Sequence, residues 1–124
     1  MKLVTHNMLT SKCLKGVNTG YPLKLVVKEI RVQSSDFNKE FISKMIPRLD
    51  WAVFVVAAKQ IGHAGNLPDQ LLPDYENNEE LLKDVHHALF EVDIYEGELI
   101  CPETNRKFQI SEGIPNMLVK ENEL

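Results

Sequence analysis

The sequence of 124 residues predicts an α+β fold in which a small antiparallel sheet, built from strands near the two ends of the chain, carries an inserted helical subdomain. Two patterns indicate this order. Near the N-terminus and again after residue 90, apolar residues alternate with polar ones or cluster with β-branched residues, whereas residues 36–90 repeat apolar residues at spacings of three and four behind helix-capping side chains. Because a pair of strands is marginally stable alone, we expect the strands from both ends to join in one unit, residues 1–35 plus 91–124.

Two strands are expected before the helical subdomain. Residues 3–8 alternate in a way that a strand allows, and residues 23–32 are rich in Leu, Val and Ile. A connector with several Gly and one Pro separates them. Within the second strand the apolar phase shifts after Val27, which predicts a bulge near Lys28.

Three helices are expected in residues 36–90. The residues in position to cap their N-termini are Asp36, Asp50 and Asn78. Pro47 would stop the first helix, and Gly62 favours the left-handed conformation that ends the second. Residues 62–77, with two Gly and two Pro, predict a surface loop.

After Phe90 the pattern predicts short strands joined by turns. We expect, in order, a strand at 92–95, a turn at Glu96 and Gly97, a strand at 99–101, a turn at 102–106, a strand at 107–110 and an extended apolar segment at 114–119. Since proline cannot donate to a strand ladder, Pro115 places the last segment at an edge of the sheet. An apolar edge is either covered by the protein itself or completed by another chain, and the residues alone leave both open.

Several classes of function find no support in the residues. No catalytic constellation and no phosphate-binding glycine loop is recognisable. His86 and His87 are adjacent, so on a helix their side chains point about 100° apart; we expect one to pack and the other to be solvated. The longest apolar run, residues 51–58, is far shorter than the roughly 20 residues of a membrane-spanning helix. Because the N-terminus does not form a signal peptide either, we expect an intracellular protein with no membrane partner.

The two cysteines, Cys13 and Cys101, are too few for a disulfide framework and lack the close spacing of a zinc site. Unpaired cysteines are among the most frequently buried residues. We therefore expect both to be reduced, buried and inert.

Charge is divided unevenly along the chain. Residues 1–59 hold ten Lys or Arg and four Asp or Glu, a net charge of +6, and residues 60–124 hold four and fourteen, a net charge of −10. The basic half raises the alternative of an RNA-binding module that touches phosphates through Lys12, Lys15, Lys24 and Lys28. Because the lysines are spread singly and no aromatic motif for base stacking accompanies them, we favour a solvated face.

Four sequence blocks, in the same order, resemble one known family. They are MKLVTHNML from Met1, DFNKEFISKMIPRLDW from Asp36, HHALFEVDIYEGELICPETNRKF from His86 and ISEGIPNML from Ile110. With these blocks the chain, up to about Val119, resembles the eukaryotic multifunctional methyltransferase subunits. The resemblance implies a zinc-ribbon-like sheet unit built from both chain ends with an inserted helical bundle, in agreement with the order expected above.

The resemblance also implies a function. Members of this family are not enzymes themselves; they bind, activate and stabilise the catalytic subunits of S-adenosylmethionine-dependent methyltransferases by covering an apolar surface and extending a sheet through strand pairing. The implied partners form heterodimers with them and methylate tRNA, rRNA and a translation termination factor. The cofactor belongs to the partner, a minor RNA contact in the complex stays open, and the implied location is the cytoplasm and the nucleus.

Carried over to this chain, the implied partner contacts are Met1, Leu3, Ile114, Pro115, Asn116, Met117 and Leu118. Some members of the family bind zinc through two pairs of cysteines. Here the second pair has become Cys101 with Thr104, and the first connector retains only Cys13. We therefore expect no structural zinc and a degenerate site held by packing and turn hydrogen bonds.

Overall fold

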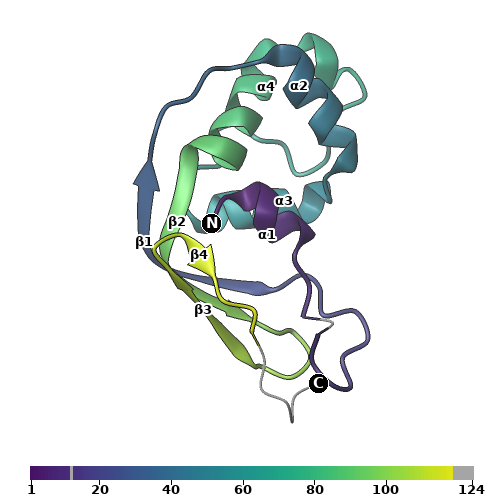
Figure 1. The fold of residues 1–124 in the computed structure, drawn as a ribbon. Coiled ribbons are helices and arrows are strands. Elements are labelled where there is room, and N and C mark those ends of the chain that lie inside the picture. The colour runs from purple at the N-terminus through teal and green to yellow at the C-terminus, as the bar shows by residue number, and fades with distance from the viewer. Residues whose placement is uncertain (12, 119–124) are drawn as a thin grey trace.

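A computed structural model describes residues 1–11 and 13–118 of the chain. Its strands form one antiparallel sheet in the order β1-β2-β3-β4 (Figure 1). They are β1 (Lys24–Val32), β2 (Val92–Ile100), β3 (Lys107–Ser111) and β4 (Ile114–Pro115). Because β1 pairs with β2 along its length, the predicted α+β class and the joining of early and late strands are confirmed.

The helices are α1 (Leu3–Met8), α2 (Lys39–Met45), α3 (Trp51–Gln60) and α4 (Glu79–His86), with 3-10 turns at Ile46–Arg48 and Tyr75–Asn77 and a π-helix, η3 (His87–Glu91), that continues α4. In Figure 1, α2 and α4 lie farthest from the sheet, and α1 and α3 lie between them and the sheet. One hydrophobic core joins these layers and includes Leu3, Leu82 and Phe108. None of the helices in the described part of the chain is long and apolar enough to span a bilayer.

Local capping signals account for α3 and α4. The side chain of Asp50 accepts the N–H of Val53 at 3.4 Å, and that of Asn78 accepts the N–H of Leu81 at 3.2 Å, so both predicted caps are confirmed. Gly62 follows α3 with a φ of +77°, the left-handed conformation expected at the end of this helix.

The predicted cap of α2 is wrong by two residues. Asn38, rather than Asp36, caps this helix, because its side-chain oxygen accepts the N–H of Phe41 at 3.1 Å. The N–H of Ser35 donates to the carboxylate of Glu91 at 2.7 Å. That bond ties the chain before Asn38 to the end of the π-helix, and α2 begins only beyond it.

The predicted strand at the N-terminus is also wrong, because these residues form α1. Leu3, His6 and Asn7 are buried on one face of this helix at spacings of three and four. Only Met1 bonds to the sheet as a strand would, since the N–H of Ile94 donates to its carbonyl oxygen at 2.8 Å. A helix of six residues is unstable in isolation, so contacts with the rest of the protein must hold it.

The predicted turn at Glu96 and Gly97 is wrong as well, since β2 runs unbroken through both residues. A Cβ atom on Gly97 would lie 2.2 Å from the carbonyl oxygen of Val26 on β1. Glycine is therefore required here for the close approach of two strands and not for a turn. The register of β1 shifts on both sides of Glu29, which confirms the predicted bulge near Lys28.

The later elements follow the prediction more closely. A turn at residues 102–106 leads into β3, and a tight turn at Glu112 and Gly113, with φ of +51° and +78°, returns the chain as β4. The strand is shorter than predicted, because residues 116–118 lie outside it. Val119, the last residue of the predicted segment, lies outside the described residues.

Candidate partner-binding surface

β4 forms an outer edge of the sheet and pairs only with β3, as predicted from its proline. Ile114 pairs with Ser111 beside the turn, and the N–H of Asn116 donates to the carbonyl of Gln109 at 2.9 Å. Because bonded residues alternate along an antiparallel ladder, Pro115 between them directs its carbonyl away from β3. Pro115 has no N–H, so at this point the edge offers an acceptor without a donor.

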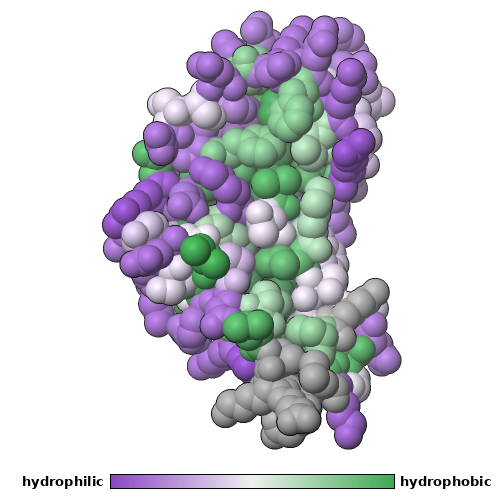
Figure 2. Space-filling view, in the orientation of Figure 1, coloured by the Kyte–Doolittle hydropathy of each residue, from purple (hydrophilic) through white to green (hydrophobic). Residues whose placement is uncertain are grey.

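The β4 edge, by which we mean residues 114–118, is apolar and exposed. Ile114 and Leu118 are 68% and 82% exposed, and Met117 packs partly against the core. In Figure 2 hydrophobic residues gather around β4 and the adjoining α1, with hydrophilic residues along the margins of the same face. A large apolar patch with a polar rim is typical of an interaction site.

The opposite edge of the sheet, β1, is less accessible. The Nε2 of His6 donates to the carbonyl of Leu23 at 2.8 Å, and the side-chain amide of Gln60 donates to the carbonyl of Leu25. Burial lowers the pKa of His6, which keeps this ring neutral near pH 7. The bulge at Glu29 further distorts the edge, and bulges of this kind hinder the addition of another strand.

The N-terminus is hydrogen-bonded to the turn that leads into β4. The ammonium nitrogen of Met1 donates to Asp93 Oδ1 at 2.6 Å, to the Ile94 carbonyl at 2.8 Å and to the Gly113 carbonyl at 2.6 Å. Gly113 belongs to the turn that precedes β4. The buried ammonium group therefore fixes this turn relative to β2, and with it the direction in which the β4 edge faces.

A carboxylate ties the first connector to the turn after β2. Glu103 accepts the backbone N–H groups of Asn18, Thr19 and Gly20 at 3.0, 3.0 and 2.7 Å. These bonds lower the pKa of Glu103 to about 2, since they stabilise the ionised form. The connector near the N-terminus is thus held to the end of the sheet by one ionised side chain.

A second link lies beside it. The hydroxyl of Ser11 donates to Cys101 Sγ at 3.0 Å, and Thr104 also hydrogen-bonds this sulfur. Burial raises the pKa of the Cys101 thiol, but the hydrogen bonds from Ser11, Thr104 and the backbone of the turn outweigh it and hold the pKa below its usual value. Cys101 is buried as expected, whereas Cys13 is exposed, so the expectation that both are buried is wrong for Cys13.

Comparison with known proteins places the chain in a family. The model of the Trm112p-like protein family matches residues 2–113. This chain belongs to the Trm112p-like family. The mouse protein named multifunctional methyltransferase subunit TRM112-like protein is 47% identical over 124 residues, covering 99% of this chain and 98% of that protein. Homolog A of TRM112 from Arabidopsis thaliana is 42% identical and both chains are covered completely, and TRM112 of Saccharomyces cerevisiae is 27% identical over 96% of each chain.

A solved structure supports the fold. A chain of the E. cuniculi Mtq2-Trm112 complex, described as responsible for methylation of the translation termination factor eRF1, superposes with a TM-score of 0.52, covering 95% of each chain at 16% identity. At this identity the likeness concerns the fold of the Trm112p-like chain and not its residues.

The zinc site that the resemblance implies for some members of the family does not fit the residues present here. A structural zinc site needs four thiolate or imidazole ligands. The turn at Cys101 supplies one thiol and the hydroxyls of Ser11 and Thr104, and Cys13 is exposed. Within residues 1–11 and 13–118 no group of three His, Cys, Asp or Glu is arranged to hold a metal. The hydrogen bonds of Cys101 and Glu103 instead join the first connector to the turn after β2.

The structure brings together only part of the predicted contact set. Ile114, Pro115, Asn116, Met117 and Leu118 all lie on the β4 edge. The side chains of Met1 and Leu3 are 3% and 1% exposed, so they belong to the core of this Trm112p-like chain and not to its free surface.

Sequence reasoning missed Asp93, whose carboxylate holds the Met1 ammonium. This residue carries no local signal of its role, since the role depends on how the N-terminal segment packs.

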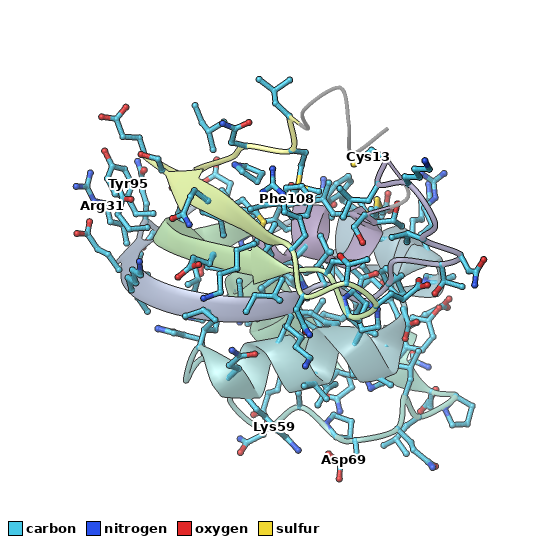
Figure 3. The ribbon with its side chains drawn as sticks, turned by 90° about the horizontal axis from the view of Figure 1, so that it is seen from below. Cys13, Arg31, Lys59, Asp69, Tyr95 and Phe108 are labelled. Carbon is cyan, nitrogen blue, oxygen red and sulfur yellow. The ribbon has the colours of Figure 1, made fainter. Side chains whose placement is uncertain are left out.

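The lysines of the RNA-binding alternative lie on the surface where the structure describes them. Lys15, Lys24 and Lys28 are exposed, and Lys28 pairs with Glu98 at 3.5 Å; Lys12 lies outside the described residues. Arg31 covers the ring of Tyr95 at 3.4 Å and pairs with a glutamate of its own strand. Figure 3 shows Arg31 and Tyr95 together at the margin of the sheet, and Lys59 with Asp69 on the outer side of α3. Lys28, Arg31 and Lys59 are thus engaged by side chains of the protein itself.

Proposed function

We propose that this chain is a non-catalytic subunit that activates and stabilises S-adenosylmethionine-dependent methyltransferases acting on tRNA, rRNA and a translation termination factor. The observation that carries the proposal is the β4 edge, where exposed Ile114 and Leu118 flank a strand with one unpaired side. The family's curated relatives are named as methyltransferase subunits, which supports the same role here.

The backbone of the β4 edge offers two groups to an added strand. Pro115 directs a carbonyl outward, and the N–H of Met117 makes no hydrogen bond within the described residues. A partner strand laid alongside Asn116 would donate to the first group and accept from the second, in either a parallel or an antiparallel direction. At Pro115 itself the missing N–H rules out a pair of exchanged hydrogen bonds. We therefore infer that the methyltransferase adds a strand that bonds to the backbone on both sides of Asn116.

Side chains complete the interface. Ile114, Met117 and Leu118 bury apolar surface against the partner, and a specific interface of this kind covers about 800 Å² on each protein. Binding to the ordered form of the methyltransferase raises the population of that form, so the subunit stabilises and activates by linkage. S-adenosylmethionine is bound by the partner, and the complexes work in the cytoplasm and the nucleus.

A pair of matched variants tests this proposal. The chain is expressed with a tag in its own cells, and the co-purified proteins are identified by mass spectrometry. Ile114→Asp places a charge on the β4 edge and is expected to remove the methyltransferases from the purified material. Leu72→Asp changes a similarly exposed residue, at 55%, in the loop before α4 and should leave them bound. Retention of the methyltransferases by Ile114→Asp would refute the proposal.

Salt distinguishes this function from the RNA-binding alternative. Direct contact with several phosphates weakens steeply between 50 and 200 mM salt, whereas an apolar interface with strand pairing responds little. The co-purified methyltransferases are expected to remain bound at 200 mM salt after ribonuclease treatment. Their release under either condition would favour the RNA-binding module.

A further inference from the structure

A relay of three titratable side chains lies in the helical part of the molecule, apart from both the β4 edge and the Cys101 turn. Nδ1 of His63 lies 3.0 Å from Nε2 of His87, and Nδ1 of His87 lies 2.9 Å from Glu91 Oε1. His63 follows α3, whereas His87 and Glu91 stand at the two ends of the π-helix η3. His63 is thus linked through its polar atoms to two residues of the π-helix that lie on successive turns.

The carboxylate decides which nitrogens carry protons. The N–H of Ser35 donates to Glu91 Oε2 at 2.7 Å, and Oε1 of the same carboxylate lies 2.9 Å from Nδ1 of His87. The carboxylate oxygen accepts, so Nδ1 of His87 is the donor, which leaves Nε2 as the nitrogen that faces His63.

The backbone holds both histidines in place. The N–H of His63 donates to the Ala58 carbonyl at 3.0 Å, a bond that closes the end of α3. His87 is part of a π-helix, a conformation that is rare and occurs frequently at functional sites. As predicted for the adjacent pair, His86 is packed, at 7% exposure, while the side chain of His87 is 36% exposed and reaches solvent.

We propose that His63 and His87 bind one divalent transition-metal ion of the zinc type, with water completing its coordination. Imidazole nitrogen is a preferred ligand of such ions, and a ligating histidine whose other nitrogen donates to a carboxylate is the usual arrangement around them. Glu91 supplies that carboxylate. The ion takes the place of the proton that the two rings share in their hydrogen bond, and solvent carries that proton from Nδ1 to Nε2 of His63.

The geometry requires a small adjustment. Two nitrogens that bind one tetrahedral zinc ion at about 2.05 Å lie about 3.3 Å apart. The observed separation of 3.0 Å must therefore widen slightly. Since His63 lies in the loop after α3, the bound ion would fasten this loop to α4 and η3, a link that is independent of any partner at the β4 edge.

Nitrogen-detected NMR of the histidine rings tests the site directly in the full chain. On titration with Zn²⁺ we expect the signals of His63 Nδ1 and His87 Nε2 to shift together and saturate at one ion per chain. His6 and His86, which are engaged with Leu23 and Ser35, serve as internal controls and should not move. Mg²⁺ at the same concentration should shift none of the four rings, because it prefers oxygen ligands. Absence of a shift at His63 and His87, or equal shifts at all four rings, would overturn the proposal.

Variants distinguish the contribution of the two histidine ligands from that of Glu91, which orients His87. His63→Gln and His87→Gln are each expected to weaken Zn²⁺ binding at least tenfold in calorimetric titration. Glu91→Gln keeps an acceptor for His87 but removes the charge, and a loss of about 10–100-fold is expected for such a change. Thermal unfolding without metal identifies any variant that fails to fold, and the double change His63→Gln with His87→Gln should add little to either single one. Unchanged affinity in both single histidine variants would contradict the assignment.

Discussion

The ammonium nitrogen of Met1 lies 2.6 Å from the carbonyl oxygen of Gly113, so the first residue of the chain directly supports the turn that precedes β4. The same nitrogen is held by Asp93, and the side chain of Met1 is fully buried. Met1 therefore positions the β4 edge through its ammonium group while its side chain, like that of Leu3, lies in the core.

The ammonium group gives the first prediction. Asp93→Asn removes a charge from its hydrogen bond with Met1 and is expected to lower the free energy of unfolding by about 1–2 kcal/mol, measured by urea denaturation. Asp69→Asn breaks an exposed ion pair with Lys59 and should have no measurable effect. Equal stability of the two variants would show that the Met1 ammonium does not need its carboxylate partner.

The second prediction follows from the buried position of Leu3. Leu3→Ala leaves a cavity at a residue that is 1% exposed and is expected to cost about 2–4 kcal/mol in the free chain. Ile114→Ala changes an exposed residue and should leave the unfolding free energy of the free chain nearly unchanged. A Leu3→Ala chain as stable as the unaltered protein would place this side chain outside the core.

Glu103 makes stability depend on pH. Its pKa is about 2 in the folded chain, below the ordinary value of 4.5 that applies when the chain is unfolded. The depressed value means that the contribution of Glu103 is fully present above about pH 4.5 and is lost as the pH falls toward 2. Glu103→Gln should therefore destabilise the chain at pH 6 and flatten the fall in melting temperature between pH 5 and 2. A variant with the same pH profile as the unaltered protein would speak against this role.

The corner around Cys101 gives a prediction about metal. To exclude the histidine site proposed above, the measurement uses the chain with His63→Gln and His87→Gln, purified without chelator; we expect EDTA to leave its melting temperature unchanged, since hydrogen bonds join the connector to the turn at Cys101. Ser11→Cys with Thr104→Cys would bring two more thiols beside Cys101, and this double variant should gain a melting temperature that rises with Zn²⁺ and falls with EDTA. Unfolding of the chain with both histidine changes by EDTA would instead show a structural metal.

Local signals in the sequence were sufficient for the helices that begin with a strong cap. Asp50 and Asn78 each accept the backbone N–H three residues later, and Gly62 takes the conformation that ends α3. Pro115 likewise predicts an edge strand, because proline has no N–H to donate to a neighbouring strand. In each case the physical cause lies within a few residues of the signal.

Signals that depend on distant packing were misleading. The six residues of α1 fit a strand or a helix equally well, and the choice is made by the bonds of Met1 and by Asn7, which exchanges two hydrogen bonds with the backbone of Asp50. Gly97 suggested a turn, but a glycine is needed there because the carbonyl of Val26, 71 positions away in the sequence, approaches it closely. The exposed residues of the β4 edge are contiguous in sequence, so their common position is predictable from local signals, whereas the edge is supported by Met1 at the opposite end of the chain.

The difference between the two edges of the sheet bears on the stoichiometry of an assembly. Side chains of His6 and Gln60 bond the carbonyls of Leu23 and Leu25 where β1 begins, and this hinders strand addition there. If strands are added at the β4 edge alone, as the proposed function implies, each chain binds one partner and the resulting pair is closed, so repeated addition into fibres is not expected.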